Sequence, residues 1–270
     1  MKKKLLSLIA VSAALATAGS ALIACGDGDK GNAKTDVTKE QWVAAFAIDN
    51  FASDFKVSAV STMVNGTESQ EMSIVVGTKQ YGDFIMTHTL KRDGKTMQEE
   101  SQMRIVGEEN DRYYKCSGRF DEDENKFIVG DWHYQDDEHE EFTAATWEER
   151  VLDEIGFEYM TVFAEKYDSF NYVNGAYVMT GDGIVIYENS DSGEGYSYSS
   201  KMTATNATIK FADNKLASVE ISMKYEHSYD YGDGDAGQST EESDTVITIT
   251  YGGQSVTAPD NATKYEDEEE

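Results

Sequence analysis

Alternating apolar and polar residues, separated by two-residue turns, constrain the fold of this chain more than any other feature of its sequence. From Phe55 to Met63 the apolar side chains fall mostly on one face of an extended segment, and Asn65-Gly66 then supplies a dipeptide favoured in tight hairpins. Asn174-Gly175 repeats this arrangement later in the chain. Because the only proline is Pro259, no proline interrupts the strand interiors. The pattern predicts antiparallel strands joined by successive hairpins.

Two segments with helical periodicity break the strand pattern. Residues 38–41 and 146–149 each match a capping box, in which a Thr caps the helix and a Gln or Glu three residues later bonds back to it. The first box predicts a helix to about Phe51, and the second a longer helix to about Lys166. Each helix would present an apolar stripe to a core. Strands and helices together predict an α+β fold.

The N-terminal segment has the composition of an export signal. Three lysines precede an apolar run from Leu5 to Ala24, and Cys25 follows. The small residue before a cysteine resembles the lipobox of bacterial lipoproteins. This resemblance implies cleavage before Cys25 and attachment of lipid, including palmitate, to that residue. An ordinary signal peptide is one alternative, and a retained membrane helix is another, because the run reaches the ~17 residues that a short span needs.

The chain is therefore expected to have four parts. Residues 1–24 form a lipoprotein signal peptide, and residues 25–37 form a flexible polar tether. Residues 38–260 form a single α+β domain, and residues 261–270 form a disordered acidic tail. We predict an exported protein that is lipid-anchored to the outer face of the cell membrane, or to the outer membrane in a Gram-negative cell.

Net charge and cysteine content exclude several classes of protein. The formal net charge is -28 over 270 residues, which argues against nucleic acid or anionic lipid headgroups as partners and favours a soluble monomer. Only two cysteines occur. If Cys25 carries lipid, Cys116 has no disulfide partner, so a disulfide framework is excluded. A cysteine in this strand-like context is expected to be a small buried residue.

No catalytic or metal-binding motif is complete. Ser53 and Lys56 have the spacing of the Ser-x-x-Lys nucleophile, but its partner motifs are missing. His133 and His139 flank acidic residues without the spacing of a zinc protease. We predict a protein that is not an enzyme and that uses neither a metal nor a cofactor.

The C-terminal strands carry a family resemblance. Residues 207–211, a tight turn, residues 215–223, residues 246–252 and the exit at 256–259 look like the ending of the LolA/LppX/LprG-type lipoproteins. The resemblance implies a strongly curved antiparallel sheet, a half-barrel, with two main helices packed on its concave side. It also implies an apolar hollow that holds acyl chains or a lipoprotein.

A ligand cavity of this kind would be lined by apolar and methionine side chains, since flexible methionines suit an adaptable pocket. The candidate lining residues are Trp42, Phe46, Met72, Met86, Met103, Trp147, Val151 and Ile155. They predict a non-enzymatic lipoprotein that binds an apolar or amphipathic ligand between sheet and helices.

An alternative prediction is a surface adhesion, sensing or scaffold lipoprotein that binds protein or glycan without a cavity. Residues 188–197 and 231–243 are rich in Gly, Ser and Asp and are predicted to be loops, on either side of a long strand from Leu216 to about Tyr229. The tyrosines that would make the contacts are Tyr196, Tyr198, Tyr225, Tyr229 and Tyr231.

Overall fold

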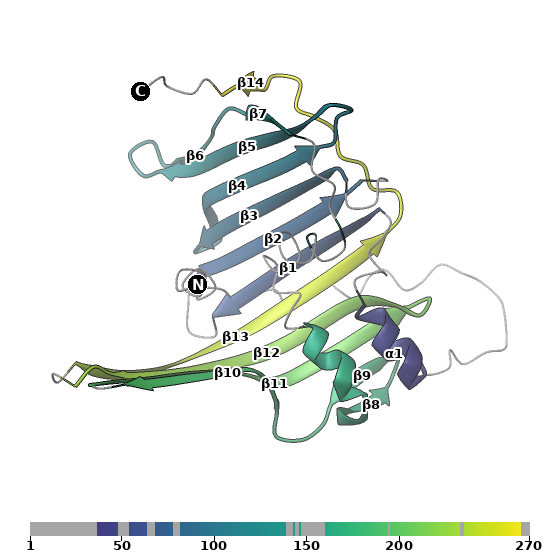
Figure 1. Cartoon of the computed structure of the whole chain (residues 1–270), viewed down its shortest axis with the longest axis vertical. Helices are drawn as coiled ribbons and strands as arrows, with labels where there is room; N and C mark the ends of the chain where they lie inside the picture. Colours follow the sequence, from purple (N-terminus) through teal and green to yellow (C-terminus); the bar gives the residue numbers. More distant parts are fainter. Residues whose placement is uncertain are drawn as a thin grey trace.

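The computed structural model describes residues 37–47, 54–63, 68–77, 82–138, 143, 146, 160–193, 195–232 and 235–265. These residues are mostly β-strand, with the helices α1 and η4 beside an open, curved sheet (Figure 1). The broad α+β class predicted from the sequence is confirmed. No helix among the described residues is long and apolar enough to span a bilayer.

The elements follow one another along the chain as a series of hairpins. In chain order they are α1 (Lys39–Ala45), β1 (Phe55–Met63), β2 (Glu68–Val76), β3 (Phe84–Arg92), β4 (Lys95–Ile105), β5 (Asn110–Asp121), β6 (Lys126–Val129), β7 (His133–Glu138), η4 (Val162–Ser169), β8 (Phe170–Val173), β9 (Ala176–Met179), β10 (Ile184–Gly193), β11 (Tyr196–Ala212), β12 (Lys215–Asp230), β13 (Ala236–Tyr251) and β14 (Thr263–Lys264).

The strands form two hydrogen-bonded sets that lie side by side. One set has the order β1-β13-β12-β11-β9-β8, with β10 also on β11, and the other has the order β14-β7-β5-β4-β3-β2, with β6 also on β5. Strands β1 and β2 are neighbours, so the sets continue one another in Figure 1. The sheet is not purely antiparallel as predicted, because β14 pairs with β7 in parallel.

Turn chemistry explains the hairpin between β8 and β9. Asn174 and Gly175 have φ values of 52° and 87°, the left-handed backbone that a two-residue hairpin turn requires. Asparagine and glycine adopt it at low cost, so this predicted hairpin is confirmed. The matching prediction at Asn65-Gly66 lies outside the described residues.

The main core lies between the two helices and one face of the first strand set. Thr38 and Gln41 form the predicted capping box, and α1 then ends at Ala45, short of the predicted end near Phe51. The helices lie together next to β8, β9 and β11 (Figure 1). Of the predicted second helix, residues 147–159 lie outside the described residues, and Val162–Ser169 forms the 3-10 helix η4.

The C-terminal segment is ordered further than predicted. The backbone amide of Tyr265 donates to the carbonyl oxygen of Tyr134 at 2.7 Å, and Lys264 pairs with Asp136 at 2.7 Å. These bonds hold β14 against β7, so the boundary of the disordered tail at residue 261 is wrong for residues 263–265. Residues 266–270 lie outside the described residues.

Candidate binding surface

Two of the predicted cavity residues belong to a filled core. Trp42 is fully buried and Phe46 is 3% exposed. The indole Nε1 of Trp42 donates to the carbonyl oxygen of Phe163 at 2.8 Å. Five aromatic rings surround the indole at centroid distances of 5.0–5.5 Å; they belong to Phe46, Tyr167, Phe170, Tyr177 and Phe211. Side chains therefore occupy the space around Trp42.

The three candidate methionines do not share one side of the sheet. Met72 and Met86 are partly buried against the main core. Met86 pairs with Gln102, whereas Met103 pairs with Ile85, the next residue of β3. Because successive side chains of a strand point to opposite faces, Met103 lies on the face away from Met86. The remaining candidates Trp147, Val151 and Ile155, and the lipidation residue Cys25, lie outside the described residues.

The longest strands extend beyond the body of the protein. Strands β11, β12 and β13 have 17, 16 and 16 residues, and with β10 they run past both helices in Figure 1. β1 ends at Met63, which pairs with Ser243. We call the four-stranded extension beyond this point, residues 187–202 and 225–241, the arm.

One face of the arm collects the aromatic residues. On β12, Val219 and Ile221 point into the main core, and Tyr225, His227 and Tyr229 continue the same alternation into the arm. We call this the aromatic face. Three rows of directly paired residues cross it: Tyr187, Met202, Tyr225 and Glu241; Asn189, Ser200, His227 and Ser239; Asp191, Tyr198, Tyr229 and Gly237.

Ring contacts make the aromatic face continuous. The ring of His227 lies 4.9 Å from that of Tyr198 and 5.8 Å from that of Tyr229, and it lies nearly parallel to Tyr225 at 6.4 Å. Tyr229 in turn contacts Tyr231 at 5.4 Å. These edge-on and offset arrangements are favourable between aromatic rings.

Glycine allows one of these rings to lie down on the sheet. A Cβ atom built at Gly237 would lie 2.8 Å from the ring of Tyr229, which is closer than unstrained atoms approach. Gly193 bears the same relation to Tyr196, at 2.4 Å. Because the glycines have no Cβ atom, the tyrosine rings of the neighbouring strand can pack directly against their backbone.

Local contacts shift the pKa of two arm tyrosines. Burial, together with the neighbouring hydroxyl of Tyr198, raises the pKa of Tyr225. The hydroxyl of Tyr196 donates to Asp191 at 3.0 Å, and this bond raises the pKa of Tyr196. Both phenols therefore stay protonated at neutral pH and remain hydrogen-bond donors.

The opposite face of the arm is hydroxyl-rich. The hydroxyls of Ser199 and Ser228 lie 2.8 Å apart across the strands. A shallow hollow of about 280 Å³ lies beside this pair, and besides the serines Ser190, Ser192, Ser197, Ser199 and Ser228 its lining includes Asp191 and Tyr198 of the aromatic face. The two faces of the arm thus differ sharply in chemistry.

The five predicted tyrosines are brought together: Tyr196 and Tyr198 lie on β11, Tyr225 and Tyr229 lie on β12, and Tyr231 directly follows the end of β12. Tyr198, Tyr225 and Tyr229 share the aromatic face, and the two most exposed tyrosines of the arm, Tyr196 (40%) and Tyr231 (52%), lie toward its tip. Sequence reasoning missed Tyr187 and His227. The alternation of aromatic residues from 225 to 231 was the signal that could have identified His227.

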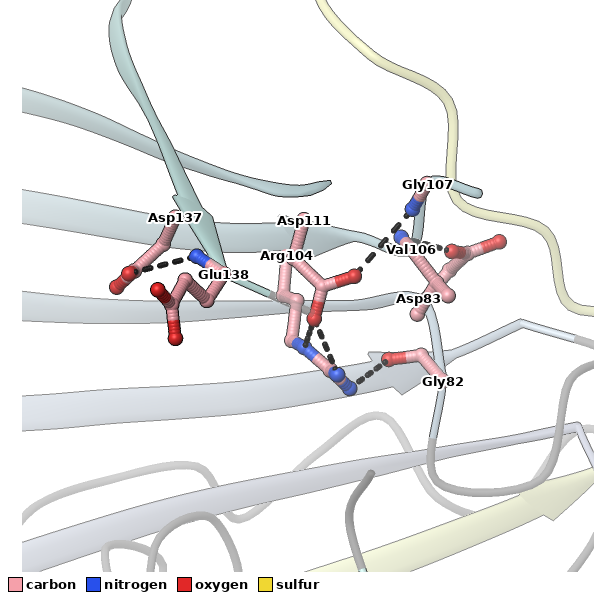
Figure 2. A network of polar contacts seen from close by, with 8 residues as sticks. All are labelled: Gly82, Asp83, Arg104, Val106, Gly107, Asp111, Asp137 and Glu138. Carbon is pink, nitrogen blue, oxygen red and sulfur yellow. Dashed lines mark hydrogen bonds and ion pairs between the residues drawn. The ribbon is translucent and has the colours of Figure 1, made fainter. Parts of the chain in front are cut away.

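A buried ion pair in the other strand set was also missed. Arg104 and Asp111 are 1% and 0% exposed, and the guanidinium donates to Asp111 through Nη2 at 2.6 Å and Nε at 3.1 Å. Figure 2 shows that Arg104 also reaches the carbonyl oxygen of Gly82, and that Asp111 accepts from the amide of Gly107. The network joins three chain segments and is best explained as structural.

Potential catalytic groups are not assembled in the described part of the chain. Cys116 is buried, its thiol donates to the carbonyl oxygen of Gly130 at 3.2 Å, and burial raises its pKa, which suppresses the reactive thiolate. No group of three His, Cys, Asp or Glu side chains within the described ranges is arranged to hold a metal ion. His133 bonds with Thr263, while His139 and Ser53 lie outside these ranges.

No protein-family model matches the chain, and no curated protein is significantly similar to it.

Proposed function

We propose that this protein is a membrane-anchored, extracytoplasmic binding protein, not an enzyme, and that it recognises a partner protein through the aromatic face of the arm. The observation that carries this proposal is the gathering of tyrosines on a projecting sheet whose face is outside the main core. The 33 residues of the arm contain six of the 16 tyrosines of the chain, seven serines and five glycines. Tyrosine with serine and glycine is the composition of antibody paratopes.

A ligand hollow between two helices and the concave side of a half-barrel is the second candidate, implied by the resemblance to LolA-type lipoproteins. It has less support, because aromatic rings fill the space around Trp42 and because Met86 and Met103 lie on opposite faces. The proposal therefore assigns recognition to the outer surface, and it takes the mature chain to be a monomer that does not bind nucleic acid.

Anchoring is tested at Cys25. Cells that produce the full chain are expected to incorporate radioactive palmitate into it, and Cys25→Ala is expected to abolish the label, since no other residue is proposed to carry lipid. Cys116→Ala serves as the matched control and should keep the label. Label that survives in Cys25→Ala would remove the basis for the lipoprotein assignment.

Recognition through the arm is tested by photocrosslinking on intact cells. The photoreactive residue p-benzoylphenylalanine replaces Tyr231, which is 52% exposed on the arm, or Tyr265, which is 62% exposed beside β7. Because the arm is proposed to make the contact, a discrete crosslinked species is expected from position 231 and not from position 265. The same species from both positions, or none from position 231, would contradict the proposal.

A further inference from the structure

We propose that the partner segment bound by the aromatic face is an extended polypeptide rich in lysine and arginine. This inference rests on the proposed function and specifies the chemistry of its partner. Three features of the arm support it: the aromatic rings, the sign of the charges around them, and an unsatisfied nitrogen among the rings.

The rings offer their negative faces to a cation. Lysine and arginine bind over tyrosine rings through cation–π attraction, which strengthens as the pair loses water. The protein already uses this contact elsewhere, since Lys215 lies 4.7 Å above the ring of Tyr251 and Arg112 lies 5.0 Å above that of Tyr134. On the aromatic face, however, none of the twelve residues in the three paired rows is a lysine or arginine.

The charges of the arm have one dominant sign. Its sequence contains eight Asp and Glu against the single basic residue Lys201, which lies on the opposite face 3.7 Å from Glu188. The charged residues in the three rows are Asp191 and Glu241, both acidic. With the chain at -28, an acidic partner or a second copy of the chain would be repelled, and a basic segment would be attracted.

His227 places a ring nitrogen without a hydrogen-bond partner among the rings. Its Nδ1 is buried, and none of the described residues bonds to it. Leaving such an atom unpaired is costly, so a donor from a ligand would be favourable here. An ammonium or guanidinium group carries only donors, which suits a neutral imidazole in the tautomer that leaves Nδ1 free.

The spacing of the rows selects an extended ligand. Alternate residues of a strand lie about 6.8 Å apart, so Tyr225, His227 and Tyr229 repeat at that distance along β12. An extended peptide lying along the arm presents its own alternate side chains at the same interval. Basic side chains at every second position would therefore meet successive rows.

The test uses the full chain in detergent micelles and three fluorescent peptides. The first alternates serine with arginine over ten residues; the second replaces each arginine by citrulline, which is neutral and nearly the same shape; the third replaces it by glutamate. The arginine peptide is expected to bind, and the citrulline and glutamate peptides to bind at least tenfold more weakly. Tyr229→Leu is expected to weaken arginine-peptide binding by about two- to thirtyfold, while Tyr229→Phe keeps the ring and should retain it.

Two further variants control for damage to the fold. Tyr172→Leu removes an exposed tyrosine from β8, outside the arm, and should leave binding unchanged. Gly237→Ala keeps every ring but adds a Cβ that must displace the ring of Tyr229. Like Tyr229→Leu, it should therefore weaken binding of the arginine peptide.

The outcomes separate this inference from the proposed function. Equal binding of the arginine and citrulline peptides would overturn the inference. So would binding of neutral oligosaccharides in place of the peptides, or arginine-peptide binding that Tyr229→Leu and Gly237→Ala leave unchanged. Crosslinking at position 231 would still support recognition through the arm in each of these cases, and its failure would remove the proposed function itself.

Discussion

Replacing Trp42 by alanine is expected to lower the free energy of unfolding by about 3–5 kcal/mol, the range for removing a large aromatic side chain from a core. The indole is fully buried, five rings pack around it, and its Nε1 holds the carbonyl oxygen of Phe163 on η4. The alanine variant therefore leaves a cavity between the two helices and loses the hydrogen bond from Trp42 to the carbonyl oxygen of Phe163. Urea unfolding followed by circular dichroism measures the change.

Val43→Ala is the matched control for this prediction, because Val43 lies on the same helix with 48% of its side chain exposed. Its effect should stay within about 0.5 kcal/mol. The loss of unfolding free energy in Trp42→Phe should lie between those of the two alanine variants, because phenylalanine keeps a ring but cannot make the hydrogen bond. If Trp42→Ala unfolded at the urea concentration of the Val43→Ala variant, the space around the indole would have to be adaptable, as a ligand cavity is.

Replacing Asp111 by alanine is expected to cost a similar amount, about 3–5 kcal/mol, for an electrostatic reason. Arg104 would keep its charge while buried, and the carboxylate that accepts two of its hydrogen bonds would be gone. The amide of Gly107 would lose its acceptor as well (Figure 2). The same unfolding experiment measures this loss, which should appear as an earlier transition of the β3–β5 region.

Two controls isolate the buried charge as the cause. The double variant Arg104→Leu/Asp111→Leu removes both charges and should recover much of the stability, because a buried ion pair can often be replaced by apolar residues at little cost. Asp168→Ala breaks the exposed pair with Lys39 and should cost at most about 1 kcal/mol. A double variant as unstable as Asp111→Ala would point to lost packing instead of an unpaired charge.

The sequence predicted those features that depend on neighbours in the chain. The capping box at Thr38 and the hairpin at Asn174-Gly175 involve residues that are three positions apart or adjacent, and the structure contains both. The strand predicted from Leu216 to about Tyr229 matches β12 closely for the same reason, because alternation is a local pattern.

Local sequence patterns did not predict the features that depend on which strands or side chains pair with one another in the fold. Residues 188–197 and 231–243 were predicted to be loops on the basis of their Gly, Ser and Asp content, yet most of them extend β10, β11 and β13. They are strands because each finds a partner in a distant or neighbouring strand: β10 pairs with β11, and β11 and β13 both pair with β12. A single sequence does not reveal such partners. The Arg104–Asp111 pair was missed because neither residue has an apolar pattern that signals burial.

The candidate site shows the same division. The five tyrosines of the alternative prediction lie near one another on the arm, whereas the arrangement of Tyr198, Tyr225 and Tyr229 on one face required the register of the strands. Two of the predicted cavity residues, Met86 and Met103, illustrate the same limit. Met86 and Met103 each occupy a position that the alternation of their own strand predicts to face the core. Only the pairing of β3 with β4 shows that they lie on opposite faces of the sheet.

The strands of the arm run along its length, and this has a mechanical consequence for a protein that holds a partner under load. A pull at the tip parallel to the strands would shear β11, β12 and β13 against one another, so that all the cross-strand hydrogen bonds between Ser197 and Met202 and their partners would resist together. A pull across the sheet would instead open the bonds between β10 and β11 one after another from the edge. The arm should therefore resist a force along its strands far better than a force across the sheet. The load under which it would release a partner then depends on the direction of that force.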